Sequence, residues 1–163
     1  MVKTDANGNK EWDKTFGGSD WDLVESIQQT ADGGYILVGY TWSYGAGNCD
    51  FWLIKTDSKG NRQWDRTFGG ANSDIACSVQ QTADGGYILA GYTWSYGAGP
   101  PAFWLVKTDS DGNKEWNKTF GGTDDDRARS ILQTVDGDYI LAGHRRSYGA
   151  GNCDFWLIKV KGE

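Results

Sequence analysis

The chain consists of three consecutive copies of one 52-residue unit. The tetrapeptide Thr-Phe-Gly-Gly begins at residues 15, 67 and 119, and Lys-Thr-Asp begins at residues 3, 55 and 107, always 52 residues apart. A constant period of this length predicts one supersecondary unit per copy, stacked on its neighbours. We therefore expect residues 1–163 to form a single repeat domain with repeats at about 3–54, 55–106 and 107–158.

Each copy holds four strand signals. In the second copy they predict strands at Asp74–Thr82, Tyr87–Thr93, Phe103–Thr108 and Lys114–Phe120. Asp-Gly turns or longer glycine-rich segments separate them, and Pro100–Pro101 interrupts one of these segments. The composition agrees, with 24 Gly, two Pro and 14% aromatic residues. The expected fold class is all-β, and four antiparallel strands in about 50 residues is the size of a β-propeller blade.

The phase of the repeat indicates where each blade begins. Small side chains concentrate in the first strand of each copy, which suits the crowded axis of a propeller, so the blades should start at Asp22, Asp74 and Asp126. The third blade then lacks a fourth strand, and the chain carries an extra one at 9–16 that could complete the C-terminal blade. Propellers typically have four to eight blades, so we expect two chains to form a six-bladed homodimer. A β-trefoil or β-prism monomer is the alternative, because three repeats of four strands also describe those folds.

The repeat resembles known propeller arrays. The segment DGGYILVGYT is similar to the diglycine-plus-strand core of kelch-type blades, and DANGNKEW is similar to the docking turn of quinoprotein blades, with one residue fewer between Asp and Gly. The whole unit resembles repeat arrays of archaeal and bacterial surface proteins. This resemblance implies a propeller fold and a parent protein that is extracellular or on the cell surface. The shortened turn, and the lack of the charged side chains that would bind a quinone, argue against a quinoprotein enzyme.

Several function classes fit this sequence poorly. The net charge of −6 disfavours nucleic acid and anionic membranes as partners. The three cysteines include no C-x-x-C pair, so they give neither a disulfide framework nor a zinc motif. The turns DANGN, DSKGN and DSDGN resemble the start of a calcium-binding loop, but no glutamate follows at the end of a twelve-residue loop. His144 is the only histidine, so no Ser-His-Asp or Cys-His constellation can repeat. We expect no enzyme activity, no metal and no cofactor, and we see no signal peptide or membrane-spanning segment in this chain.

The long loops carry the candidate binding residues. They lie on one side of the expected blades and bring together aromatic and acidic side chains: Trp42, Tyr44, Trp94, Tyr96, Tyr148, Asp22, Asp74 and Asp126. Aromatic faces stack on sugar rings and carboxylates accept hydrogen bonds from hydroxyls. The leading prediction is thus a non-enzymatic, lectin-like module that binds glycan and assembles with itself. The alternative is a structural or protein-interaction fragment without a small-molecule ligand.

Each candidate also has a structural interpretation. The aromatic side chains could be wedged between adjacent blades, and the three aspartates could cap loop N–H groups at the start of a strand. The six other repeated tryptophans are expected to pack blade against blade: Trp12, Trp64, Trp116, Trp52, Trp104 and Trp156. The third copy replaces the loop tryptophan by Arg146, so one of three related sites is expected to be specialised or inactive.

Overall fold

The computed structural model describes residues 1–98, 101–149 and 151–162. In these ranges the chain is all-β, with thirteen strands in four antiparallel sheets and no helix. Pro100, one half of the predicted Pro-Pro interruption, lies outside the described residues.

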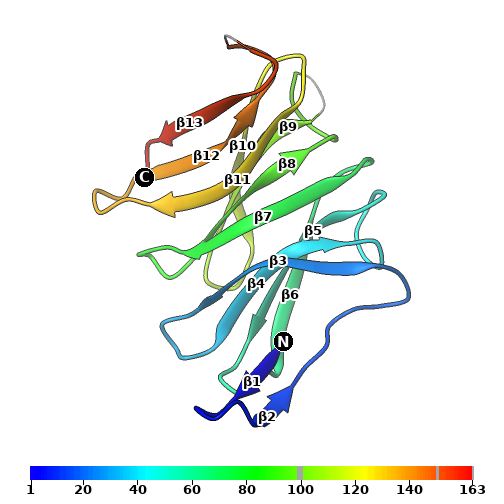
Figure 1. Cartoon of the computed structure of the whole chain (residues 1–163), viewed down its shortest axis with the longest axis vertical. Coiled ribbons are helices and arrows are strands. Elements are labelled where there is room, and N and C mark those ends of the chain that lie inside the picture. Colours follow the sequence, from blue (N-terminus) through cyan, green and yellow to red (C-terminus); the bar gives the residue numbers. More distant parts are fainter. Residues whose placement is uncertain (99–100, 150, 163) are drawn as a thin grey trace.

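Three of the sheets are meanders in which each strand pairs with the next one along the chain (Figure 1). The first sheet contains β3 (Asp22–Gln29), β4 (Tyr35–Thr41), β5 (Asp50–Thr56) and β6 (Arg62–Phe68). The second contains β7 (Asp74–Gln81), β8 (Tyr87–Thr93), β9 (Ala102–Thr108) and β10 (Lys114–Phe120). The third contains β11 (Asp126–Gln133), β12 (Tyr139–Arg145) and β13 (Asp154–Val160).

The observed strands follow the predicted phase. In the second copy β8 and β10 have the predicted bounds, and β7 and β9 differ from them by one residue. Each of these three sheets begins at the repeated aspartate, and the third sheet has only three strands among the described residues. The turns explain this agreement: Gly33, Gly85 and Gly137 have φ between 81° and 86°, a backbone conformation that glycine adopts without steric cost.

The sheets stack face to face in chain order, with the first and third on opposite faces of the second (Figure 1). One core cluster joins Phe51 and Leu53 of β5 to Leu89 and Trp104 of the second sheet. The other joins the second sheet to the third through the residues one repeat later, including Phe103 of β9. The inner strands of the second sheet therefore send alternate side chains to two different interfaces, which explains why β8 and β9 are buried along their whole length.

A short N-terminal hairpin forms the fourth sheet, in which β1 (Val2–Thr4) pairs with β2 (Lys10–Asp13). It covers the outer part of the first sheet, where Phe16 packs on Leu37, Trp52 and Ile54. The hairpin and β13 lie at opposite ends of the stack (Figure 1). In a single chain the predicted N-terminal strand thus pairs with β1, and pairing with the third sheet remains a prediction for an assembly.

Candidate functional site

A cleft opens between the first and second sheets on the side of the long loops. It has a volume of about 360 Å³, and its wall combines two indole rings with polar and small side chains: Trp42, Trp94, Asn48, Asn72, Ser73, Cys49 and Ile75. Two sequence-predicted residues, Trp42 and Trp94, therefore line the same cavity. They occupy equivalent positions in neighbouring repeats, one after β4 and the other after β8.

The backbone and a neighbouring tyrosine hold each indole in place. The Trp42 N–H donates to the carbonyl of Trp21 at 2.9 Å, and the Trp94 N–H donates to that of Ser73 at 3.0 Å. Tyr40 packs edge-on against Trp42, and Tyr92 packs in the same way against Trp94, with ring centroids 5.2 Å apart in both pairs. Trp42 nevertheless keeps 41% of its surface exposed, so an apolar ring face is available at the cleft.

Asn72 adds an oriented polar group. Its side-chain Nδ2 donates to the Trp94 carbonyl at 3.2 Å, and its backbone N–H donates to Ser95 Oγ at 3.1 Å. Among the described residues, none donates a hydrogen bond to Asn72 Oδ1, which leaves an acceptor beside the indole of Trp94. Asn48, Asn72 and Ser73 lie in the long loops and Ile75 lies in β7, but none of the four was among the binding residues predicted from the sequence.

The equivalent position between the second and third sheets is filled. Arg127 replaces Ile75 there, and its guanidinium lies over the rings of Tyr92 and Trp94, 4.9 Å and 5.4 Å from their centroids. Asp125, which replaces Ser73, accepts hydrogen bonds from Arg127 Nε at 2.7 Å and Nη2 at 3.0 Å. Burial opposes the charge of this guanidinium, yet the contact with Asp125 raises the pKa of Arg127 overall. The third repeat has thus replaced an open cleft by a stacked ion pair.

The three repeated aspartates serve the loops. Asp74 and Asp126 are fully buried, and Asp74 accepts hydrogen bonds from Thr93 Oγ1, from Ser95 Oγ at 2.7 Å and from the Gly70 N–H at 2.9 Å. Asp22 has the same set of donors in the first repeat. Burial would raise the pKa of Asp22 and Asp126, but the hydrogen bonds to each carboxylate lower it overall. This geometry is that of the loop-capping interpretation, and none of the three aspartates lines the cleft.

The predicted tyrosines also contact the scaffold. Tyr44 packs on Trp52 and Tyr96 on Trp104, with centroids 5.3 Å apart in both pairs. The hydroxyl of Tyr44 donates to the carbonyl of Gly17 at 3.1 Å, and that of Tyr96 donates to the carbonyl of Gly69 at 2.7 Å. Tyr148 is exposed in the third repeat, with the guanidinium of Arg145 near its ring. None of the three lines the cleft that Trp42 and Trp94 share.

One buried carboxylate, that of Asp50, directly follows Cys49 of the cleft wall in the chain. Asp50 is almost completely buried, and its Oδ2 accepts the Ala46 N–H at 2.5 Å, whereas its Oδ1 has no hydrogen-bond partner among the described residues. Burial, reinforced by the charge of Asp74, raises the pKa of Asp50. Burial also raises the pKa of the Cys49 thiol in the cleft wall, so this cysteine is a poor nucleophile.

The described parts of the chain contain no cluster of three or more His, Cys, Asp or Glu side chains suited to a metal ion. Within the same ranges no helix is long and apolar enough to span a membrane. No protein-family model matches the chain, and no curated protein is significantly similar to it.

Proposed function

We propose that this protein is a non-enzymatic carbohydrate-binding module whose ligand occupies the cleft between Trp42 and Trp94. The observation that carries this proposal is the shared cavity, in which two indoles from neighbouring repeats flank the side chains of Asn48 and Asn72. A sugar presents C–H groups on the faces of its ring and hydroxyls around its edge. Indole faces and amide groups are complementary to those two kinds of surface.

We further propose that the sheets are propeller blades and that two chains close a six-bladed ring. Each sheet is a four-stranded meander, or three strands of one, and each packs face to face on the next, which supports this architecture over a trefoil or prism. In a two-chain ring the cleft would occur twice on one face. Two weak sites on one particle bind a multivalent glycan with avidity that neither site has alone.

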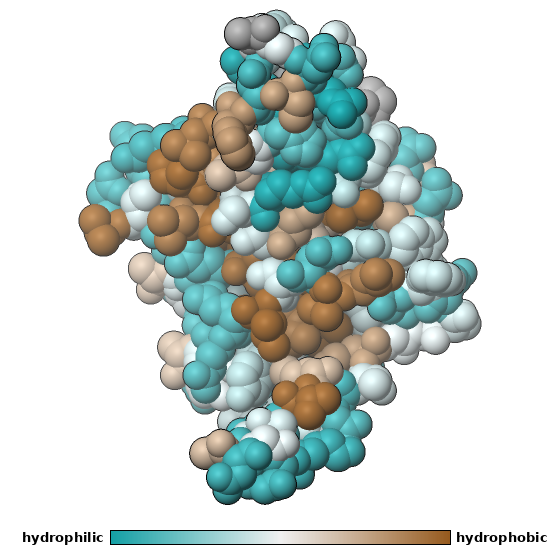
Figure 2. Space-filling view, viewed as in Figure 1, coloured by the Kyte–Doolittle hydropathy of each residue, from teal (hydrophilic) through white to brown (hydrophobic). Residues whose placement is uncertain are grey.

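A structural or protein-interaction role is the second candidate. It is favoured by exposed apolar side chains near both ends of the stack, among them Val24 and Ile27 of β3 and Phe155 and Leu157 of β13. Figure 2 shows apolar surface over β3 and, near the C-terminus, over β13. Such surface on a folded chain is typical of a protein-binding region.

A glycan array followed by titration calorimetry tests the carbohydrate proposal. Glycans that bind the wild type should lose affinity about tenfold or more, ~1.4 kcal/mol, when Trp42→Ala and Trp94→Ala are combined. Tyr148→Ala is the matched control, because it removes an exposed aromatic ring from an equivalent loop outside the cleft. An array without binding at high protein concentration would favour the structural role.

A second variant closes the cleft and keeps both tryptophans. The combination of Ser73→Asp and Ile75→Arg copies the Asp125–Arg127 pair that the chain already uses one repeat later. The new guanidinium should stack over Trp42 as Arg127 stacks over Trp94, so the fold should be retained while glycan binding is lost. Unchanged glycan affinity in this variant would place the ligand elsewhere.

A further inference from the structure

The strand β1 corresponds to the end of β5 in both repeat position and pairing, and to the end of β13 in repeat position. Residues 1–4 stand 52 residues before 53–56 of β5 and 156 residues before 157–160 of β13. In the first sheet Ile54 pairs with Asp65 and Lys55 with Trp64.

The hairpin pairs in the same register. Val2 pairs with Asp13 and Lys3 with Trp12. The backbone of Met1 exchanges hydrogen bonds of 2.7 Å and 2.8 Å with Lys14, the residue equivalent to Arg66. The strand β2 therefore accepts β1 as β6 accepts the second half of β5.

The strand β2 also lies against the first sheet in the way that β6 lies against the second. Trp12 packs on Tyr35 with centroids 6.3 Å apart, and Trp64 packs on Tyr87 with centroids 5.8 Å apart. Lys14, the residue after β2, donates from its Nζ to Asn61 Oδ1 at 2.9 Å, which connects the end of the hairpin to the turn before β6. The hairpin thus occupies, against the first sheet, the position that β6 and the end of β5 occupy against the second sheet.

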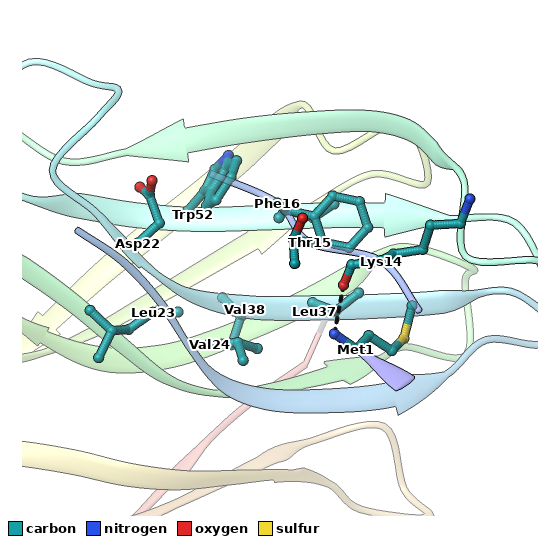
Figure 3. A pocket seen from close by; sticks show the side chains of 12 residues that line it. Met1, Lys14, Thr15, Phe16, Asp22, Leu23, Val24, Leu37, Val38 and Trp52 are labelled. Carbon is teal, nitrogen blue, oxygen red and sulfur yellow. Dashed lines mark hydrogen bonds between the residues drawn. The ribbon is translucent and has the colours of Figure 1, made fainter. Parts of the chain in front are cut away.

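A pocket remains between the hairpin and the first sheet. It has a volume of about 200 Å³, and its wall includes Met1, Phe16, Val24, Gly39 and Trp52 (Figure 3). At the boundary between the second and third sheets the equivalent of this pocket contains the ring of Phe103, which packs on Trp156. The ring also approaches Gly143, the equivalent of Gly39, where an added Cβ would lie 2.7 Å from Phe103 Cζ. The pocket beside Gly39 and Trp52 is therefore the position in which a phenylalanine side chain lies one boundary further along the chain.

The residue that fits this pocket is Phe155 of a second copy of the chain. Phe155 is the third-repeat equivalent of Phe51 and Phe103; those two are fully buried, whereas Phe155 is fully exposed. Leu157 shows the same contrast, being 70% exposed, while Leu53 and Leu105 are fully buried. The third sheet offers the side chains that the first sheet lacks on its open face.

We propose that β1 is an internal substitute for the second half of β13, and that the β13 of a second copy displaces it when the ring closes. This inference rests on the two-chain ring proposed above. In the closed ring β13 of the second copy would pair with the same residues of β2 that β1 pairs with here, so β1 must leave before β13 can bind. The strand β1 is held weakly: it has three residues, Val2 is 62% exposed, and the ion pair of Lys3 with Glu11 is exposed to solvent.

A disulfide that locks β1 in place tests the displacement. Val2 and Asp13 form a pair next to the hydrogen-bonded pair of Met1 and Lys14, and a pair in that position brings Cβ atoms close enough for a disulfide. Val2→Cys with Asp13→Cys should be made together with Cys153→Ser, which removes an exposed thiol. We expect the mass of one chain after oxidation and of two chains after reduction; equal masses in the two states would overturn the displacement.

A shortened chain gives an independent readout. Removing residues 1–4 and placing a new initiator Met before Asp5 should make self-association about tenfold tighter than in the wild type, equivalent to ~1.4 kcal/mol. For the disulfide experiment, the double variant Asp13→Cys with Cys153→Ser, which keeps Val2, is the control for loss of the Asp13 carboxylate. Equal association of the shortened and wild-type chains would overturn the role of β1 alone. A single-chain mass for both at high concentration would overturn the ring itself.

Discussion

Phe103 and Trp156 pack across the boundary between the second and third sheets, with ring centroids 4.8 Å apart and planes at 51°. The same contact, at 4.5 Å and 56°, joins Phe51 to Trp104 one boundary earlier. The remaining members of the series, Phe155 and Trp52, lie at opposite ends of the stack. The repeated contact supports the proposal that the two end faces of this chain are complementary to each other.

Two alanine variants at the same repeat position should behave differently. Phe103→Ala leaves a cavity in the buried core and should lower the free energy of unfolding by about 3–5 kcal/mol. Phe155→Ala removes an exposed ring and should change the stability of the single chain by about 0.5 kcal/mol or less, yet abolish self-association. Denaturant titration at low protein concentration measures the first effect and light scattering the second. Full self-association of Phe155→Ala would contradict the account.

A designed disulfide can report the contact between copies. Cys49 forms a parallel β-bridge with Ser73 across the first boundary, where the Asp74 N–H donates to the Cys49 carbonyl at 2.7 Å. The equivalent residues at the closing boundary are Cys153 of one copy and Trp21 of the other. Trp21→Cys should therefore form covalent dimers with the native Cys153 under mild oxidation, and Cys153→Ser should prevent them. Monomers alone on a non-reducing gel would exclude this closing geometry.

Protonation of Asp50 should stabilise the folded chain, whereas protonation of a carboxylate with a lowered pKa destabilises it. Burial raises the pKa of Asp50 in the folded state, so its contribution to stability is fully present below the unfolded-state pKa, about 3.9, and is lost as the pH rises through the folded-state pKa. Asp50→Asn should stabilise the fold at pH 7 by on the order of 1 kcal/mol, because a partly unsatisfied buried carboxylate is removed. The gain should shrink toward pH 4 in thermal unfolding; a gain independent of pH would contradict this explanation.

Asp32 should have the opposite pH dependence. A hydrogen bond from the buried Lys55 Nζ at 2.8 Å lowers the pKa of Asp32 to about 2. Its contribution is therefore present above the unfolded-state pKa, about 3.9, and is lost as the pH falls through about 2. Asp32→Asn should destabilise the fold at neutral pH and reduce the acid sensitivity of unfolding.

The matched control is Asp136→Asn. Its partner Lys159 is half exposed, whereas Lys55 is buried, so solvent should screen the Asp136 interaction and the loss of stability should be smaller. Equal losses in the two variants, measured by denaturant titration at pH 7, would show that burial of the lysine does not matter.

The sequence was sufficient to predict the strands because each turn, and each alternation of apolar and polar residues, occurs in three independent copies. The sequence could not reveal that Arg127 and Asp125 fill the equivalent position between the second and third sheets, since that depends on side-chain stacking across a sheet boundary. It also left the aspartates ambiguous between ligand and cap. Their burial and their Ser and Thr donors, which become visible only when the loops are placed together, give the caps a concrete geometry.

The N-terminal strand illustrates a different limit. Residues 9–16 were expected to pair with the third sheet, but in one chain the nearest third-strand sequence is the one at residues 2–4, and the two form a local hairpin. A local hairpin closes with little loss of chain entropy, whereas pairing with β13 of another copy depends on concentration.

The molar mass of the wild-type chain in solution tests the central claim most directly. Size-exclusion chromatography with light scattering over a range of concentrations should give twice the 18.0 kDa mass of one chain, because each copy contributes the Phe155 and β13 that the other copy lacks. A mass of 18.0 kDa at every concentration would contradict the ring.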